Sequence, residues 1–295
     1  MKITIVAPSG RIDEKYLEEG IEALLKEGHS VKKTSGVGGK GVGVFSATDS
    51  IRANDLETAI KDEQTEVIWC SRGGYGAVRT LETMDLDLLR RNKKMIVGFS
   101  DITAIHAVTV NAGGMGVLGP MMKHIARHRT QAEDVRNTFA LLRGETIEKT
   151  CKRGEGSRNG HARAKIVGGN LSILYSLRGT PAEIETKGNI LFIEDVSEYR
   201  YHIDRMMQNL RFGGVLKDLA GLVVGQMTDM KDGMTKFGQD AYGIIAEAVR
   251  EYDYPVLMGF PSGHEDDENQ PILLGGMCDL TVTDEGGRLR MGKDA

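Results

Sequence analysis

The sequence predicts an α/β protein with a mostly parallel sheet flanked by helices in its first half, and a smaller β/α domain after it. In the first half, short apolar runs alternate with longer amphipathic segments, the pattern of strands connected by helices. The second half continues the alternation with a larger share of short strands. The chain has 295 residues, enough for one large domain or two ordinary ones.

In the first half, short apolar runs that end in turn residues predict the strands. Residues such as Leu17, Ile21 and Leu24 recur at helical spacing and predict a helix that ends at Gly28. The other helices follow from similar patterns. The predicted strands are 2–8, 30–34, 66–70 and 95–99, and the predicted helices are 13–28, 49–63, 77–91, 100–112 and 130–143.

A change of composition divides the chain. Residues 144–163 are charged, contain several glycines and have few large apolar side chains, which predicts a linker or an exposed excursion. We therefore expect an N-terminal domain at 1–143 and a C-terminal domain at 164–295. In the second, the predicted strands are 164–169, 189–195, 219–225 and several within 255–290, and the predicted helices are 170–177, 198–211 and 239–251.

The bulk composition excludes several classes of protein. With 38 basic and 42 acidic residues the net charge is −4, which argues against a nucleic-acid partner. No apolar stretch approaches the ~20 residues that span a bilayer, and the N-terminus lacks a signal-peptide pattern. Three widely spaced cysteines without a CxxC pair favour neither disulfides nor a zinc site. We expect a cytoplasmic protein without a membrane partner.

Two motifs resemble ligand sites only superficially. GVGGKG (36–41) matches G-x-G-x-x-G, but no helix start follows it and it lies after the second predicted strand, so a surface loop is the better interpretation. HEDDE (264–268) resembles a metal-binding cluster, but adjacent acidic residues in a loop are usually solvated. We expect no cofactor and no metal.

Ser100 lies where a buried strand turns into a helix, and this position has two possible uses. Its hydroxyl could cap the helix, a contribution of about 1 kcal/mol, and position alone favours that role. It could instead be a nucleophile beside the N–H groups of the helix terminus. The surrounding GFSDI is not the G-x-S-x-G elbow, because Ile102 replaces the last glycine.

Two adjacent glycines, Gly73 and Gly74, follow the strand predicted at 66–70. They permit a tight turn, and they also let the backbone approach a ligand closely. If strands 66–70 and 95–99 are neighbours in a parallel sheet, their carboxyl ends lie at the same edge, where such sheets bind ligands. Gly73, Gly74 and Ser100 are then expected to meet.

A nucleophilic serine needs a base and an acid that orients it. Of seven histidines, His264 lies in a loop of Pro, Gly and polar residues after an apolar strand, where catalytic groups are often found. His106 is expected to be packed within a helix, and His124 and His128 to lie on a solvated basic face. Glu194 and Asp195 end a strongly apolar strand, and capping of the next helix suits Asp195 better.

Together these motifs resemble the L,D-carboxypeptidase family of serine peptidases, which includes the microcin-immunity peptidases. The resemblance covers nearly the whole chain, in order: IVAPSG, IRANDLETAI (51–60), RGGYGAVR (72–79), GFSDITAIH (98–106), GPM (119–121), VGGNLSIL (167–174), LFIEDVSEYRYHIDRMMQNL (191–210) and GFPSGHEDDENQPILLGG (259–276).

The resemblance implies a fold, a site and a reaction. Ser100 would be the nucleophile, His264 the base and Glu194 the acid, and the triad would assemble at the domain interface. The N–H groups of Asp101 and Gly74 would form the oxyanion hole. The substrate would be a murein tetrapeptide that loses its terminal D-alanine during cell-wall recycling, and family members are often homodimers.

An exopeptidase must also bind a free carboxylate, for which Arg72, next to Gly73, and the start of helix 100–112 are candidates. Two alternatives remain. A microcin-type peptidase acting on peptide–nucleotide conjugates would need aromatic residues for stacking, and the only tryptophan, Trp69, lies in a predicted strand. A non-catalytic muropeptide-binding protein would not need the complete Ser/Glu/His set. The residue before the D-amino acid, diaminopimelate or lysine, stays open.

Overall fold

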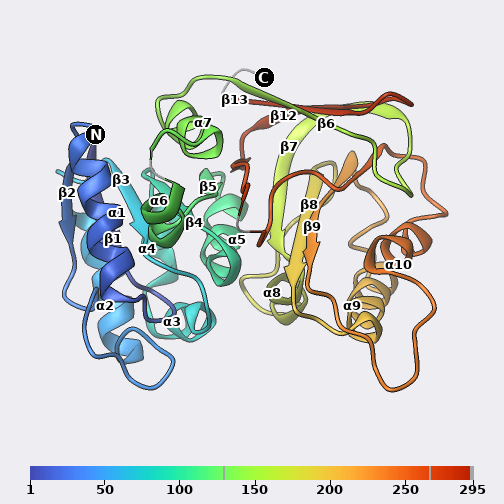
Figure 1. The fold of residues 1–295 in the computed structure, drawn as a ribbon. Coiled ribbons are helices and arrows are strands. Elements are labelled where there is room, and N and C mark those ends of the chain that lie inside the picture. Colours follow the sequence, from blue (N-terminus) through green and yellow to red (C-terminus); the bar gives the residue numbers. More distant parts are fainter. Residues whose placement is uncertain (129, 266, 293–295) are drawn as a thin grey trace.

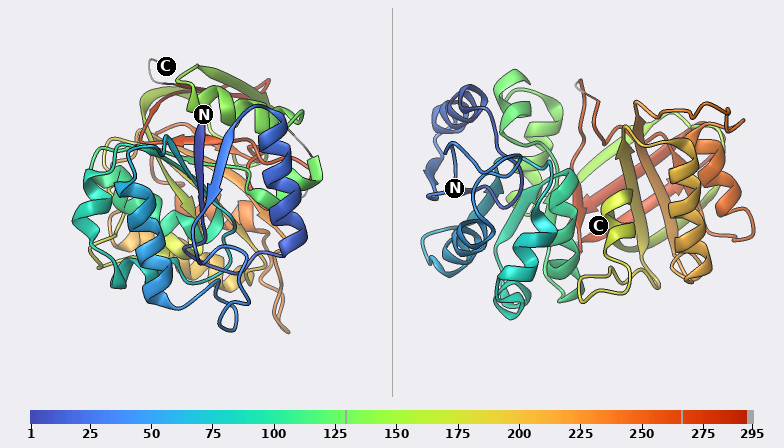
Figure 2. Two further views of the ribbon diagram at one scale, coloured as in Figure 1. Left: turned by 90° about the vertical axis from the view of Figure 1, so that its left-hand side faces the viewer. Right: turned by 90° about the horizontal axis from the view of Figure 1, so that it is seen from below.

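The computed structural model describes residues 1–128, 130–265 and 267–292. Two sheets lie side by side, and helices α5 (Thr103–Asn111) and α8 (Leu171–Ser176) lie between them (Figures 1 and 2). This arrangement confirms the predicted fold class.

The first sheet has the strand order β11-β5-β4-β3-β1-β2, and all its neighbours are parallel except β11. The chain passes from β1 outward to β2 and then returns to the other side of β1 with β3. Ligands bind open α/β sheets at such a reversal of strand order, outside the carboxyl ends of the strands. The strands are β1 (Lys2–Val6), β2 (Ser30–Lys33), β3 (Val67–Cys70), β4 (Met95–Gly98), β5 (Gly116–Leu118) and β11 (Ile272–Leu274).

Helices flank this sheet, and polar residues begin several of them. Asp13 caps α1 by accepting the Lys15 N–H, and Thr48 caps α2 by accepting the Ile51 N–H, which satisfies N–H groups that have no partner within a helix. Besides α5, the helices of this half are α1 (Glu14–Lys26), α2 (Asp49–Lys61), α3 (Ala77–Thr83), α4 (Leu86–Arg91), α6 (Met122–His128) and α7 (Glu133–Leu142).

The second sheet has the order β10-β9-β8-β7-β12-β13-β6. Strands β7 to β10 are parallel, and the remaining pairs are antiparallel. Its strands are β6 (Ile147–Cys151), β7 (Gly160–Asn170), β8 (Ile190–Val196), β9 (Gly221–Thr228), β10 (Val256–Met258), β12 (Met277–Val282) and β13 (Gly287–Gly292), and its other helices are α9 (Arg200–Phe212) and α10 (Ala241–Ala248).

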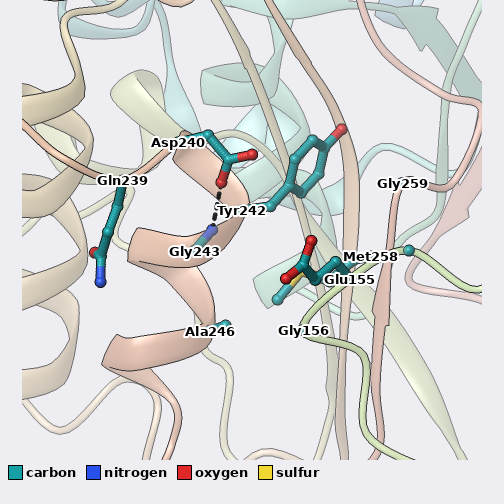
Figure 3. Close-up of a pocket in the computed structure, with 10 residues that line it drawn as sticks. Glu155, Gly156, Gln239, Asp240, Tyr242, Gly243, Ala246, Met258 and Gly259 are labelled. Carbon is teal, nitrogen blue, oxygen red and sulfur yellow. Dashed lines mark hydrogen bonds between the residues drawn. The ribbon is translucent and has the colours of Figure 1, made fainter.

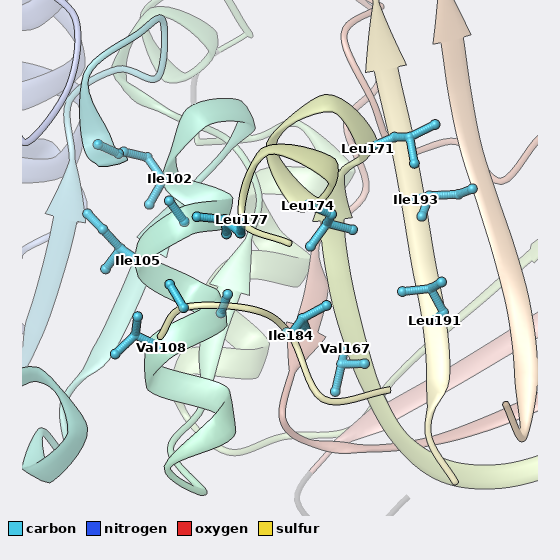
Figure 4. Close-up of a cluster of buried hydrophobic side chains, with 14 of the residues drawn as sticks. Ile102, Ile105, Val108, Val167, Leu171, Leu174, Leu177, Ile184, Leu191 and Ile193 are labelled. Carbon is cyan, nitrogen blue, oxygen red and sulfur yellow. The ribbon is translucent and has the colours of Figure 1, made fainter. Parts of the chain in front are cut away.

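One apolar cluster joins the two halves. Figure 4 shows side chains of α5 facing α8 and the strands β7 and β8. Because such side chains are removed from water only when the halves pack together, their burial holds the two sheets in a fixed relation. The cluster includes Ile102, Ile105, Val108, Val167, Leu171, Leu174, Leu177, Ile184, Leu191 and Ile193.

The structure corrects several predicted elements. The expected linker at 144–163 contains β6 and the start of β7. β6 is an edge strand in which exposed residues alternate with buried or partly buried ones. Strand β5, of three residues, and helix α6 were not predicted, since they are too short to show a period. Strand β11 falls among the short strands expected within 255–290, but it belongs to the first sheet. The helix predicted at 77–91 is two helices, because Met84 adopts an extended conformation. In the described part of the chain, no helix has the length and apolar character needed to cross a bilayer.

Candidate active site

A cavity of about 510 Å³ lies at the carboxyl ends of β3 and β4, against the loop that contains His264. Five of the residues expected at the site line it, namely Arg72, Gly73, Gly74, Ser100 and His264. Its other lining residues are Ile12, Asp13, Tyr16, Ser71, Phe99, Met121, Lys123 and Val196. The structure therefore brings the serine, the glycine turn and the histidine to one cavity.

Ser100 does not cap its helix. It is the first residue of a short 3₁₀ turn that continues into α5, and no side-chain capping bond is present at either start. Its backbone has a φ of 60°, a left-handed conformation that is rare outside glycine. Such strain persists where the surrounding fold enforces it, often at active sites. The capping role expected from position alone is therefore wrong, and the hydroxyl is left for the cavity.

The Gly73–Gly74 turn packs directly against Ser100. A Cβ placed on Gly73 would lie 2.7 Å from the Phe99 carbonyl oxygen, 2.9 Å from Ser100 Cβ and 3.3 Å from the Asp101 nitrogen. Gly74 has a φ of 97°, which favours glycine. The Gly73 carbonyl accepts the Gly10 N–H at 2.9 Å, so the loop after β1 fixes the turn. Only glycine allows this approach to the backbone after Ser100.

The carboxylate of Asp101 ties three loops together below the cavity. It accepts hydrogen bonds from Ser9 Oγ and, at 2.7 Å, from the Ala77 N–H. Burial raises the pKa of this carboxyl, and these hydrogen bonds and the charge of Arg52 oppose the rise. Arg52 is itself buried and donates to the carbonyls of Pro8 and Gly76 at 3.0 and 2.7 Å. The loops after β1, β3 and β4 are therefore cross-linked around Ser100.

His264 is held by a buried carboxylate. Its Nδ1 lies 2.7 Å from Glu194 Oε2, and the Glu194 side chain is 0% exposed. Burial alone would lower the pKa of His264, but the charge of Glu194 and its hydrogen bond outweigh it, so the pKa is raised. The Phe99 ring packs against the imidazole with centroids 4.8 Å apart. Among the described residues, no hydrogen bond joins the side chains of His264 and Ser100.

Asn170 connects this pair to the other half of the molecule. Its Nδ2 donates to Glu194 Oε1 at 3.2 Å and to Asp195 Oδ1 at 3.0 Å, and its backbone N–H donates to Thr103 Oγ1 at 2.9 Å. Thr103 lies in the first turn of the helix that follows Ser100. Burial and the charge of Glu194 raise the pKa of Asp195 to about 7. Asp195 was expected to cap the helix that follows it, but that helix, α9, has Tyr199 at its start and no side-chain capping bond. Asp195 instead accepts the Ser172 N–H at 2.8 Å, in the first turn of the preceding helix α8.

The loop that contains His264 is anchored on both sides. Gln226 at the end of β9 accepts the Glu265 N–H at 3.0 Å. Asp134 of α7 accepts the Asn269 N–H at 2.9 Å, and the same carboxylate oxygen lies 2.7 Å from His124 Nε2 on α6. The His124 side chain is only 13% exposed. The expectation that His124 lies on a solvated face is therefore wrong, because α6 packs against the site.

Other expectations have clear outcomes. His106 is fully buried and its Nε2 contacts the Ile96 carbonyl at 3.1 Å, as expected of a packed histidine. Trp69 is also fully buried, with its indole N–H donating to the Pro120 carbonyl at 3.1 Å. Arg72 reaches the cavity, but its Nη1 donates to the Arg11 carbonyl at 2.5 Å.

The structure also contains a cavity of about 580 Å³ between α10 and the loop at 154–156 (Figure 3). Tyr242 lies on its α10 side, and Glu155 and Met258 lie on the opposite side. The residues that line it include neither Ser100 nor His264. It is separate from the candidate active site.

Sequence reasoning missed four residues that shape the site, namely Phe99, Asn170, Asp134 and Lys123. Asn170 carried a signal, since an asparagine after two glycines at a strand end is a common helix cap. Phe99 directly precedes Ser100 in the chain, whereas Asp134 and Lys123 reach the site only through the tertiary fold.

Comparison with known proteins agrees with this architecture. The LD-carboxypeptidase N-terminal domain matches residues 3–119, and the LD-carboxypeptidase C-terminal domain matches residues 163–280. A probable murein peptide carboxypeptidase of Bacillus subtilis is 31% identical over 267 residues, 89% of this chain and 83% of that protein. The murein tetrapeptide carboxypeptidase of Pseudomonas aeruginosa is 25% identical, over 98% and 94% of the two chains.

Solved structures show the same fold. A muramoyltetrapeptide carboxypeptidase from Oxalobacter formigenes superposes with a TM-score of 0.89 at 26% identity, covering 99% of each chain. The microcin C7 self-immunity protein MccF superposes with a TM-score of 0.83 at 19% identity, over 99% of this chain and 95% of that one. The two domain matches together span most of the sequence, and the chain therefore belongs to the LD-carboxypeptidase family of peptide hydrolases.

Proposed function

We propose that this chain is a serine-type L,D-carboxypeptidase that releases the terminal D-alanine of a murein tetrapeptide. The observation that supports it most directly is the buried Glu194 carboxylate, 2.7 Å from Nδ1 of a histidine on the cavity that Ser100 also lines. The relatives named as murein peptide carboxypeptidases support the substrate class.

In the proposed mechanism, Ser100 Oγ attacks the carbonyl carbon of the bond between the L-configured centre and D-alanine. His264 Nε2 accepts the hydroxyl proton and then donates it to the leaving nitrogen as the C–N bond breaks, which leaves an ester on Ser100. Water then attacks this ester, His264 accepts its proton, and the proton returns to Ser100 Oγ as the shortened peptide leaves.

Electrostatics favour each charge that forms. Glu194 stabilises the imidazolium, in keeping with the raised pKa of His264. The N–H groups of Asp101 and Gly74 are proposed to bind the oxyanion. The first N–H groups of a helix have no partner within it, and the Gly74 N–H donates to no other described residue. Loss of one such donor costs about 2.7–4 kcal/mol of transition-state stabilisation.

The test measures D-alanine release from purified tetrapeptide by the parent, Ser100→Ala and Ser50→Ala. Ser50 is an exposed serine in the first turn of α2 and is the matched control. We expect release by the parent and the control, and a loss of about 10³-fold or more in Ser100→Ala. Release by Ser100→Ala at the parental rate would exclude the serine mechanism. A parent that binds the peptide and releases nothing would favour the muropeptide-binding alternative.

The microcin-type alternative gains no support from the single tryptophan of the chain. A peptidase acting on a peptide–nucleotide conjugate would use an exposed aromatic ring to stack on the base. Trp69 is fully buried in β3, an interior strand of the first sheet, and its indole N–H donates to the Pro120 carbonyl. The likeness to MccF, at 19% identity, concerns the fold.

A further inference from the structure

Lys123 lies between the two cavities that flank His264. Two cavities flank His264, the site cavity of about 510 Å³ and a smaller one of about 120 Å³. Four residues line both of them, namely Phe99, Met121, Lys123 and His264. Apart from the histidine, Lys123 is the only member of this group that can carry a charge.

The ammonium group of Lys123 is available to bind a ligand in the site cavity. Within the described part of the chain it makes no hydrogen bond or ion pair, and its side chain is exposed to the cavity. The other cation of the site cavity, Arg72, already donates to the Arg11 carbonyl. The acid of the site cavity, Asp13, accepts the N–H of Lys15 at the start of α1. The site cavity therefore contains one cation without a partner among the described residues.

The backbone of Lys123 is fixed relative to His264. The next residue, His124, contacts Asp134, and the same carboxylate accepts the N–H of Asn269 from the histidine's own loop. On its other side α6 packs against α1, where Gly20 leaves room for Met122. A side chain on so constrained a turn can select a substrate group by position as well as by charge.

The geometry of the proposed reaction places a negative charge on this side. His264 must donate a proton to the leaving nitrogen, so the leaving residue lies on the histidine side of the scissile bond. In a carboxypeptidase the leaving residue bears the free α-carboxylate, attached one carbon away from that nitrogen. We propose that Lys123 binds this carboxylate and so restricts the enzyme to terminal residues. This assignment rests on the proposed function.

The test compares tetrapeptide with its C-terminal amide, using the parent, Lys123→Met, Lys123→Arg and the control Lys217→Met, an exposed lysine that lines neither cavity. The parent is expected to prefer the acid by about 10- to 100-fold in kcat/KM, the range typical of a hydrogen bond to a charged group. Lys123→Met should lose this preference, mainly through KM, and should cleave the amide as the parent does. Lys123→Arg should retain most of the preference, and Lys217→Met all of it.

A second measurement separates binding from chemistry. In a Ser100→Ala background, calorimetry should show weaker tetrapeptide binding when Lys123→Met is added, and no change in amide binding. An unchanged acid preference in Lys123→Met would overturn the assignment while leaving the peptidase proposal intact. Loss of the preference in Arg72→Met alone would overturn it in favour of Arg72. A parent that releases no D-alanine would overturn the proposed function, and the assignment with it.

Discussion

Replacement of Glu194 by glutamine removes one charge from the site and almost no volume. The carboxylate lies 2.7 Å from His264 Nδ1 and is fully buried, which puts the charge centres of the protonated pair about 4 Å apart. At an effective dielectric of about 20, that pair is worth about 4 kcal/mol. This energy corresponds to about 10³-fold in rate, close to the about 10⁴-fold loss typical of neutralising a triad acid. We expect Glu194→Gln to reduce kcat/KM by 10³- to 10⁴-fold on these estimates.

The same change should shift the pH dependence. His264 acts as a base only when neutral, so the parent's activity rises with pH through the raised pKa of His264. Without the charge of Glu194 that pKa falls, since burial then acts with less opposition. The acid limb of kcat/KM should therefore move to lower pH while the plateau drops.

The stability of Glu194→Gln should also depend on pH. A raised histidine pKa stabilises the fold below the unfolded value of 6.5 and loses that effect as pH rises through the folded pKa. The raised pKa of Asp195, about 7, has a cost that grows between pH 4 and 7, and removal of its charged neighbour relieves it. Both effects make the variant relatively more stable at pH 8 than at pH 5.

The assay is D-alanine release between pH 5 and 9, with urea unfolding at pH 5 and 8 as the control for folding. An acid limb that stays in place, with a plateau within about tenfold of the parent, would refute the assignment of Glu194 as the group that charges and orients His264.

Three further variants test the supports of the site. Gly73→Ala should lower kcat/KM by about 10²-fold, because the new methyl group displaces the backbone at Ser100. Gly39→Ala, where no atom lies within 4 Å of the new carbon, should match the parent. Equal activity of the two variants would contradict the argument from close approach. Thr103→Val should lower the free energy of unfolding by about 1–3 kcal/mol, because a buried N–H then loses its acceptor, and an unchanged urea midpoint would count against this. Asp134→Ala removes an anchor of the His264 loop. It should lower the free energy of unfolding by about 1–3 kcal/mol and kcat/KM by about tenfold. A variant with parental values for both would refute this role.

Much of the first sheet followed from local patterns. The strand cores at 3–6, 67–70 and 95–98 are mostly apolar because both of their faces are covered by helices. Short or half-exposed elements had no such signature. Strand β11, three residues long, pairs with β5 of the first sheet from the far end of the chain, and no local pattern encodes that partner. Strand β6 contains charged residues. Such residues are compatible with pairing at the edge of a sheet, but in the sequence they are typical of a linker.

The candidate site shows the same division. A bare serine and a double glycine at the ends of neighbouring apolar strands pointed to Ser100 and Gly73, because the carboxyl ends of parallel strands share an edge. Glu194 ends a strand of the other sheet, and the family resemblance assigned its role. The φ of 60° at Ser100, which leaves its hydroxyl out of any cap, is enforced by packing against the glycine turn. The structure therefore excludes the helix-capping role that the position of Ser100 alone had favoured.

The sequence alone therefore determines the residue types at the strand ends, the family motifs and the alternation of strands and helices that defines the fold class. Contacts between segments more than 60 residues apart are not. The bond from Glu194 to His264, the bridge of Asn170 to Thr103 and the placement of Lys123 through Asp134 arise when two sheets pack on one apolar cluster. Burial of that cluster supplies the free energy that brings them together, and it depends on the whole fold rather than on any local run of residues.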